Sequence, residues 1–191
     1  MISTKNKNTN KKNLRGTLGF SMIELMSTVG IAAILATVGA PSLTSFMMNN
    51  RISAQTNAFL TDLAQARQEA VKLHVPVVVS AAAAGTTINF TQTNWSYGRA
   101  AYADVNASGA YDAGDYIIKV NHKLPGRVAL SNADGLSQIQ YRPNGTTNAV
   151  AGTRFTVCQD GYLGRDIVIT PTGRAFVVPR TVTTCPGTPA S

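Results

Sequence analysis

The feature that most constrains this chain is a run of 24 uncharged residues, 25–48, near its beginning. As an α-helix such a run would be about 36 Å long, at about 1.5 Å per residue. The hydrocarbon core of a bilayer is roughly 30 Å thick, and about 20 apolar residues cross it. The sequence therefore predicts a helix that is long enough to span a membrane.

One acidic residue, Glu24, stands at the start of this run. A carboxylate inside a bilayer costs about 2.5–3.5 kcal/mol or more, and such a residue usually has a partner. The nearest basic residues in the sequence are Arg15, nine positions before it, and Arg51, 27 positions after it. We therefore expect the partner of Glu24 to come from outside this chain.

Residues 19–26 read Gly-Phe-Ser-Met-Ile-Glu-Leu-Met and follow a basic leader. This stretch resembles the class III signal of type IV pilins and of type II secretion pseudopilins. The resemblance implies that a prepilin peptidase cuts after Gly19 and that the new N-terminal residue, Phe20, is N-methylated. It also implies that Glu24 pairs with the free N-terminus of a neighbouring subunit in a filament, which would supply the missing cation.

Two other interpretations account for parts of the same stretch. A secretory signal peptide also has a basic start and an apolar core, and residues 38–40 offer small side chains for its cleavage. However, Pro41 follows at once, and Glu24 would lie inside the apolar core. An ordinary transmembrane anchor would explain the apolar run but not Glu24.

The placement of charge indicates a direction across the membrane. The chain has 17 basic and 9 acidic residues, a net charge of +8, and residues 1–19 alone contribute +5 without any acid. A basic segment before a membrane helix marks the cytoplasmic side. The rest of the chain, with a net charge of +3, should then lie on the far side, which is the periplasm if the chain comes from a Gram-negative bacterium.

Beyond residue 48 the apolar residues follow one face of a helix. They recur at spacings of four and three, as Ile52, Thr56, Phe59, Leu63, Ala66, Ala70 and Leu73. The charged and polar residues fall largely off this stripe, at Arg51, Asp62, Arg67, Gln68 and Lys72. We therefore expect one helix over 20–74, which His74 caps and which Pro76 prevents from continuing.

The remainder of the chain has the pattern of short strands separated by Gly, Pro, Asn and Asp turns. The expected strand segments are 77–79, 88–90, 95–102, 115–120, 127–130, 138–141, 154–157, 167–170 and 175–178. Many short strands after one helix predict an α+β fold, with an antiparallel sheet packed on the helix stripe. The expected divisions are a cleaved leader at 1–19, a membrane-spanning half-helix at 20–46, an amphipathic half-helix at 47–74 and a β-rich domain at 75–191.

The two cysteines, Cys158 and Cys185, predict a disulfide if the domain is exported to an oxidising compartment. Closing a loop of about 28 residues would stabilise the fold by roughly 3–4 kcal/mol. Enzyme functions find little support, because the sequence has no Gly-x-Ser-x-Gly, phosphate loop or paired-His motif, and only two histidines for acid–base chemistry. We therefore expect a substrate of a peptidase and a methylase and not a catalyst.

Four later stretches narrow the family: Trp-Ser-Tyr-Gly at 95–98, Asp-Val-Asn-Ala-Ser-Gly-Ala-Tyr-Asp at 104–112, Tyr-Arg-Pro-Asn-Gly at 141–145, and Ile-Val-Ile-Thr-Pro-Thr-Gly-Arg at 167–174. In this order they resemble the GspH/FimT group, the minor pseudopilins of type II secretion and minor pilins of type IV pili. The resemblance implies the type IV pilin-like fold and a subunit that sits near a filament tip and helps start assembly. The implied partners are other pilins or pseudopilins, the peptidase/methylase and an inner-membrane assembly platform.

A calcium loop is one interpretation of the region after residue 103. Oxygen-bearing side chains fall at loop positions 1, 3, 5, 9 and 12, which are Asp104, Asn106, Ser108, Asp112 and Asp115, with a glycine at position 6. Position 12 is not the usual glutamate, and no helical pattern flanks the loop. The alternative is a polar hairpin loop whose Asp, Asn and Gly residues form turns. No other cofactor is expected.

DNA binding is the alternative function. Arginines gather late in the chain, at Arg142, Arg154, Arg165, Arg174 and Arg180, and Arg165, Arg174 and Arg180 are the candidates for contacts with phosphates. Some FimT-type pilins that bind DNA during natural transformation carry Gly-Arg-x-Arg near the C-terminus. Here Gly173-Arg174-Ala175-Phe176 matches only the first half of that motif, so only Arg174 carries over. The alternative interpretation of the late arginines is that they are solvated residues at strand ends.

Overall fold

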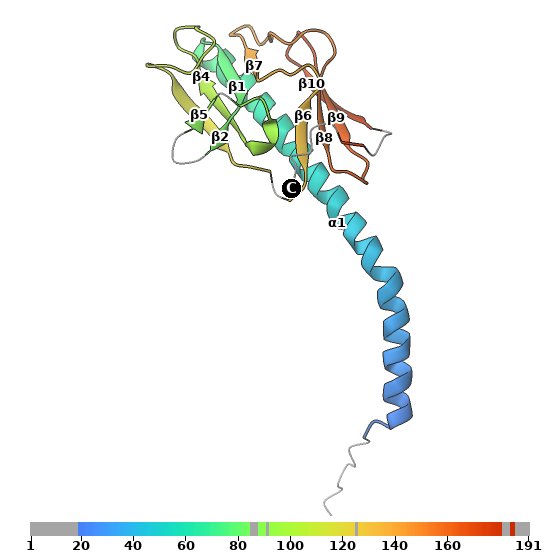
Figure 1. The fold of residues 1–191 in the computed structure, drawn as a ribbon. Coiled ribbons are helices and arrows are strands. Elements are labelled where there is room, and N and C mark those ends of the chain that lie inside the picture. The colour runs from blue at the N-terminus through green and yellow to red at the C-terminus, as the bar shows by residue number, and fades with distance from the viewer. Residues whose placement is uncertain (1–18, 85–87, 91, 125, 181–183, 186–191) are drawn as a thin grey trace, which may run out of the picture. The chain divides into compact units, whose positions relative to one another are not determined.

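The computed structural model describes residues 19–84, 88–90, 92–124, 126–180 and 184–185. Of the predicted leader, only Gly19 belongs to the described residues. Along the described chain one helix, α1, comes first, and ten strands follow it with a short 3-10 helix between the third and fourth (Figure 1).

Helix α1 runs from Met22 to Leu73. Ser21 caps its start, because the Ser21 hydroxyl oxygen accepts a hydrogen bond of 3.2 Å from the Glu24 amide. At its end His74 adopts a φ of 59°, and the His74 amide donates to the Ala70 carbonyl oxygen at 3.1 Å. The predicted helix over 20–74 therefore agrees with the observed one to within two residues at each end.

The chain divides into two compact units, residues 1–42 and 43–191, and the division falls within α1. In the first unit all described side chains from residue 19 to 37 are exposed. By length and composition α1 could cross a membrane, a property that it shares with signal sequences near an N-terminus.

The second unit contains two four-stranded antiparallel sheets. In the first sheet the strands lie in the order β5 (Tyr116–Asn121), β4 (Arg99–Ala103), β1 (Val77–Ala81) and β7 (Gln138–Tyr141). β1 is central and entirely buried, and its Val79 lies opposite Ala101 on one side and Ile139 on the other. Its run of apolar residues thus reflects burial on both faces.

In the second sheet the order is β10 (Ala175–Pro179), β9 (Arg165–Ile169), β8 (Thr153–Cys158) and β6 (Ala129–Asn132). Phe155 of β8 lies opposite Ile167 of β9 and Asn132 of β6. A separate hairpin joins β2 (Ala83–Ala84) to β3 (Ile88–Asn89), and the 3-10 helix η1 spans Trp95–Tyr97.

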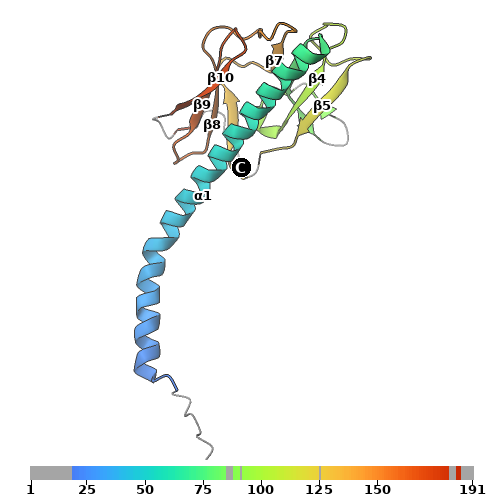
Figure 2. The same cartoon turned by 180° about the vertical axis from the view of Figure 1, so that it is seen from behind.

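The core forms where α1 meets both sheets (Figure 2). Phe59 of α1, Trp95 of η1 and Phe155 of β8 are completely buried, and their ring centroids lie 4.9–5.7 Å apart. The predicted helix stripe is buried from Ile52 to Ala70, and Leu73 is half-buried. Tilted and edge-to-face aromatic contacts of this kind stabilise a core beyond the burial of area alone.

The sequence predicts the strand segments better than their arrangement. It anticipates one antiparallel sheet, whereas the structure has two sheets and a small hairpin. Alternating apolar residues mark a strand and its buried face, but they do not specify which strands pair. The pairing of β6 with β8, for example, joins segments with β7 between them in the sequence.

One residue of the predicted exposed face of α1 is in fact buried. Asp62 is only 3% exposed, because it forms ion pairs with Arg99 of β4 and Lys119 of β5. The helical periodicity placed Asp62 off the apolar stripe because a charged residue is normally solvated. Its partners lie on strands far along the chain, which the periodicity of α1 cannot reveal.

Candidate functional site

The predicted cleavage site lies immediately before α1. Gly19 and Phe20 have no regular secondary structure, and the Phe20 side chain is 78% exposed. Exposed backbone outside a helix is suitable for a peptidase, because its amide and carbonyl groups are not engaged in a helix ladder. Cleavage and N-methylation at this position stay predictions.

Glu24 lies in the first turn of α1 with its carboxylate exposed. The partial positive charge of a helix N-terminus favours a carboxylate there by about 0.3–1 kcal/mol. Within the described part of the chain Glu24 forms no ion pair. Its charge therefore remains available to a cation from another molecule, as the sequence analysis expects.

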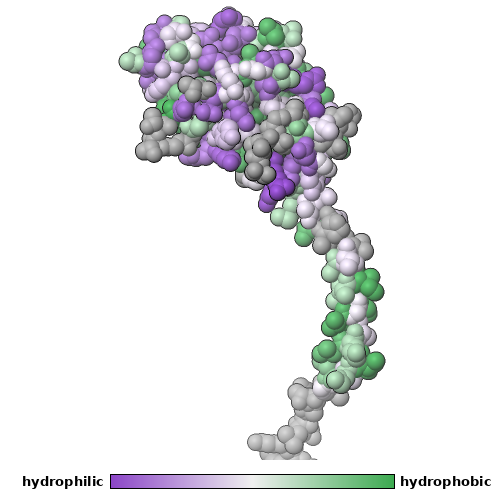
Figure 3. Space-filling model, viewed as in Figure 1, coloured by the Kyte–Doolittle hydropathy of each residue, from purple (hydrophilic) through white to green (hydrophobic). Residues whose placement is uncertain are grey.

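The N-terminal half of α1 presents large apolar side chains to the outside (Figure 3). Those exposed by 48–89% between residues 22 and 47 are Met22, Ile23, Leu25, Met26, Val29, Ile31, Ile34, Leu35, Leu43, Phe46 and Met47. Exposed apolar side chains in such number mark contact with a membrane or with other proteins. Because side chains on all sides of the helix take part, lipid or several neighbouring helices could cover it.

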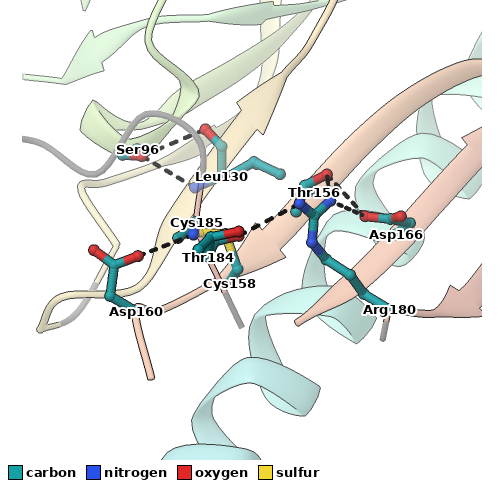
Figure 4. Close-up of a disulfide and its surroundings, with 9 residues drawn as sticks. All are labelled: Ser96, Leu130, Thr156, Cys158, Asp160, Asp166, Arg180, Thr184 and Cys185. Carbon is teal, nitrogen blue, oxygen red and sulfur yellow. Dashed lines mark hydrogen bonds and ion pairs between the residues drawn. A yellow bond between two sulfur atoms is a disulfide. The ribbon is translucent and has the colours of Figure 1, made fainter. Parts of the chain in front are cut away.

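The two cysteines form the predicted disulfide, between Cys158 at the end of β8 and Cys185 (Figure 4). The Asp160 carboxylate accepts a hydrogen bond of 2.9 Å from the Cys185 amide. Nearby, Arg180 donates to the Thr184 carbonyl oxygen at 3.4 Å. The disulfide and these two bonds hold the described part of the C-terminal segment beside β8.

The predicted DNA-binding arginines do not come together. Arg165 and Arg180 lie at one end of the β9–β10 hairpin, where the Arg180 amide donates to the Gly164 carbonyl oxygen at 3.3 Å. Arg174 lies in the turn at the opposite end, with its guanidinium over the Phe176 ring at 5.9 Å. Five strand residues at about 3.4 Å each separate the two ends by roughly 17 Å.

Acidic partners further reduce the positive charge at the Arg180 end. Asp166 is 4% exposed and forms ion pairs with Arg154 at 2.9 Å and with Arg180 at 3.5 Å. The Thr156 hydroxyl also donates to the Asp166 carboxylate, at 2.8 Å. Arg180 is therefore largely engaged within the fold, whereas Arg165 and Arg174 are exposed.

The structure adds Arg67, which the sequence analysis did not select as a site residue. Arg67 of α1 donates to the Gly145 carbonyl oxygen at 3.0 Å and to the Thr172 carbonyl oxygen at 3.2 Å. It lies beside Arg174 and Lys72 along one groove. No sequence signal indicates this grouping, because the two bonds join residues 78 and 105 positions apart.

In the candidate calcium loop the carboxylates accept hydrogen bonds from the loop itself. Asp104 is completely buried and accepts from the Ser108 amide at 2.9 Å, and Asp115 accepts from the Val105 amide at 2.9 Å. Burial raises the pKa of the neighbouring Tyr102, and the Asp104 and Asp115 carboxylates raise it further. The loop thus forms a compact, negatively charged turn.

The remaining oxygen ligands of that loop are also engaged with one another. Asp112 accepts hydrogen bonds from the Asn106 side-chain amide at 2.9 Å and from the Ser108 hydroxyl at 2.8 Å. Among the residues that the structure describes, no three His, Cys, Asp or Glu side chains are grouped as metal ligands. These contacts support the alternative of a polar turn, and calcium binding stays a prediction.

A helix with an exposed apolar half, joined to an antiparallel β domain that packs on its other half, is the architecture of a pilin-like subunit. The family model described as type II transport protein GspH matches residues 55–187. This chain belongs to the GspH family. No curated protein matches the sequence significantly.

Two solved structures share the fold. Both are crystal structures of the type IV minor pilin FimU from Pseudomonas aeruginosa, each 20% identical to this chain. One covers 70% of this chain and 92% of FimU with a TM-score of 0.56, and the other covers 66% and 92% with a TM-score of 0.52. The predicted type IV pilin-like α+β fold is thereby confirmed, and the family is one of structural pilin subunits.

Proposed function

We propose that this chain is a minor subunit of a type II secretion pseudopilus or a type IV pilus and that it helps to start filament assembly. The observation that carries the proposal is the exposed apolar half of α1 with Glu24 in its first turn. Apolar helix faces of neighbouring subunits can cover this surface. A neighbour's N-terminal ammonium can then neutralise the Glu24 carboxylate.

The same proposal gives each part of the chain a role. Residues 1–19 form a leader that keeps the start of the chain in the cytoplasm, and residues 20–46 anchor the precursor in the inner membrane. A prepilin peptidase cuts the chain between Gly19 and Phe20, and a methylase then methylates the new N-terminal amine of Phe20. Residues 47–74 carry the domain at 75–191, which lies in the periplasm. An assembly platform then moves the subunit from the bilayer into the filament.

A role in starting assembly predicts a change in filament number. Deleting the gene should sharply reduce the number of filaments, or of secretion events, because fewer filaments would begin. The remaining filaments should keep their normal length. Counting and measuring filaments by electron microscopy in deleted and complemented cells checks this. Filaments of normal number but reduced length would contradict a role in initiation.

The alternative is a pilus-displayed DNA receptor, and the observation in its favour is the exposed Arg174 near Arg67 and Lys72. Mature protein in nonionic detergent should then retard a DNA duplex at about 50 mM salt, because released counterions drive such binding. Arg174→Ala or Arg165→Ala should weaken binding severalfold and reduce the salt slope by about 0.9 per lost contact.

The matched control for this DNA experiment is Arg127→Ala, which removes the same charge from an exposed position outside the β9–β10 hairpin. It should leave DNA binding nearly unchanged. An absence of any retardation at low salt would eliminate the receptor function. Equal losses in all three variants would indicate non-specific attraction to a basic protein.

A further inference from the structure

A groove of about 740 Å³ runs along α1 in the second unit. One wall consists of residues of α1, including Leu60, Ala64 and Val71. The other wall consists of β7 and two turns, at Gly145 and Gly173. The exposed apolar half of α1 does not belong to this groove, so the proposed role in filament assembly does not use it. Only the alternative DNA receptor would, through Arg174, Arg67 and Lys72.

The charged side chains that line the groove are all basic. Arg67, Lys72 and Arg174 line it, and none of the described lining residues is Asp or Glu. The nearest recorded acidic contact is Glu69, which lies 3.5 Å from the Lys72 ammonium and outside the lining. Cations gathered in a concave surface concentrate the field and attract an anionic group.

One residue that lines the groove carries a buried hydroxyl for which the described part of the chain offers no hydrogen-bond partner. Tyr141 of β7 lines the groove and is completely buried, and within the described residues its hydroxyl makes no hydrogen bond. Leaving a buried hydroxyl unsatisfied costs about 1–3 kcal/mol, so native proteins rarely do so without a reason. An oxygen acceptor that enters the groove and displaces the side chains covering this hydroxyl would remove this cost.

The Tyr141 hydroxyl also keeps its proton and can donate a hydrogen bond. Burial raises the pKa of Tyr141 to about 12, although the nearby Arg67 guanidinium lowers it. The hydroxyl is therefore protonated at neutral pH. Arg67 and Tyr141 both line the groove.

The two glycine turns fix the position of Arg67. The Arg67 side chain donates to carbonyl oxygens of both turns, and these bonds use its Nε and Nη2 atoms. In the described structure its Nη1 atom makes no hydrogen bond and can serve a ligand. A Cβ atom at Gly173, where φ is 79°, would collide with the Gly145 carbonyl oxygen, so the close approach of the two turns requires glycine at position 173.

We propose that this groove binds an acidic side chain, flanked by apolar residues, from a neighbouring filament subunit. The Tyr141 hydroxyl and the Arg67 guanidinium would donate to the carboxylate, and such charge-assisted bonds are the strong ones. Leu60, Ala64 and Val71 would cover the apolar neighbours, since Val71 is now 46% exposed. The identity of the partner rests on the proposed function, whereas the groove's preference for a carboxylate does not.

The interior of the groove distinguishes a peptide from DNA. A DNA backbone carries closely spaced phosphates and would contact the exposed rim cations Arg174 and Lys72. Its sugars and phosphates are polar and would pack poorly against Leu60 and Val71. A single carboxylate flanked by small apolar side chains can accept from the Tyr141 hydroxyl while its apolar neighbours pack against Leu60 and Val71.

Binding can be measured with mature protein in nonionic detergent and the labelled peptide acetyl-Ala-Leu-Glu-Leu-Ala-amide. We expect this peptide to bind about tenfold more tightly than its Gln version, because charge-assisted bonds are about twice as strong as neutral ones. Tyr141→Phe should weaken the Glu peptide about five- to tenfold without lowering the melting temperature, because it removes an unpaired hydroxyl. The matched control is Tyr116→Phe, which changes an exposed tyrosine of β5 and should have no effect.

Equal affinity for the Glu and Gln peptides, or an unchanged affinity in Tyr141→Phe, would overturn the proposal. A DNA duplex that competes with the Glu peptide and loses affinity equally in Tyr141→Phe would overturn it in favour of nucleic acid. A loss of melting temperature in Tyr141→Phe would show that the hydroxyl has an internal partner, and this too would contradict it.

A photocrosslinker in place of Gln68, which is exposed and lines the groove, tests the partner in cells. We expect an adduct with a filament subunit at a peptide that contains Asp or Glu. If the chain enters filaments but no such adduct forms, this inference fails and the proposed function stands. If the chain never enters filaments, the proposed function fails, and the peptide measurements still decide whether the groove selects a carboxylate.

Discussion

A chain with Glu24→Ala is expected to be cleaved after Gly19 as usual but to enter filaments far less than the unaltered chain. The physical reason is the N-terminal ammonium of a neighbouring subunit, which would lose its partner in an apolar filament core. An unpaired charge in such surroundings costs about 2.5–3.5 kcal/mol. This corresponds to a loss of roughly two orders of magnitude in the association constant.

The Glu24 experiment has a matched control in the same helix. Glu69 is the only other glutamate of the chain, and it forms an exposed pair with Lys72. Glu69→Ala should therefore leave incorporation nearly unchanged. Incorporation is measured as the share of the protein found in sheared filaments, relative to the total in the cells.

Cleavage is followed in the same cells by mass spectrometry of the N-terminal peptide. For the unaltered chain and for both variants the first residue should be N-methylated Phe20. Normal incorporation of Glu24→Ala would refute the proposed pairing. A mature protein that retains the leader, or begins near residue 40, would refute the assignment of the cleavage site itself.

Local patterns in the sequence were sufficient for the elements of the fold. The spacing from Ile52 to Ala70 predicted the buried face of α1, because helical periodicity depends only on residues three or four positions apart. The strand at Val77 and the disulfide between Cys158 and Cys185 were likewise predicted from residue type. The helix face and the strand depend on residues within a short window, and the disulfide depends on the chain having only two cysteines.

The groove at Tyr141 could not be predicted in the same way. Its floor, its cations and its two glycine turns come from α1, β7 and the β9–β10 turn, which meet only after folding. Tyr141 appeared in the sequence as part of a family motif, and nothing in that motif indicates that its hydroxyl has no hydrogen-bond partner among the described residues. For the late arginines the sequence suggested a grouping that the fold does not form. Arg165 and Arg174 are near each other in sequence but lie at opposite ends of the β9–β10 hairpin.

Replacing Asp62 should have the largest effect on stability. Asp62 is 3% exposed and Arg99 2%, and the Asp62 carboxylate also accepts from Asn121 at 3.2 Å and pairs with Lys119 at 2.7 Å. Asp62→Ala leaves the Arg99 guanidinium buried without a counter-charge. Breaking a buried pair in this way costs about 3–5 kcal/mol.

Unfolding can be followed through Trp95, which is the only tryptophan and lies in the core against Phe59. Urea titrations of the mature protein in detergent micelles should give a much lower midpoint for Asp62→Ala. Glu69→Ala is again the matched control, because its pair with Lys72 is exposed on the same helix, and exposed pairs contribute about 1 kcal/mol or less. Equal losses in the two variants would mean that the Asp62 pair is not buried.

The double variant Asp62→Leu with Arg99→Met separates the cost of an unpaired charge from a need for the pair itself. Replacing a buried ion pair by apolar side chains of similar volume is often neutral or stabilising. We therefore expect the double variant to recover most of the stability that Asp62→Ala loses, although Lys119 and Asn121 then lose their acceptor. Because Lys119 is about one third exposed, water can solvate its ammonium. A double variant as unstable as Asp62→Ala would show that the pair itself is needed to hold α1 against β4.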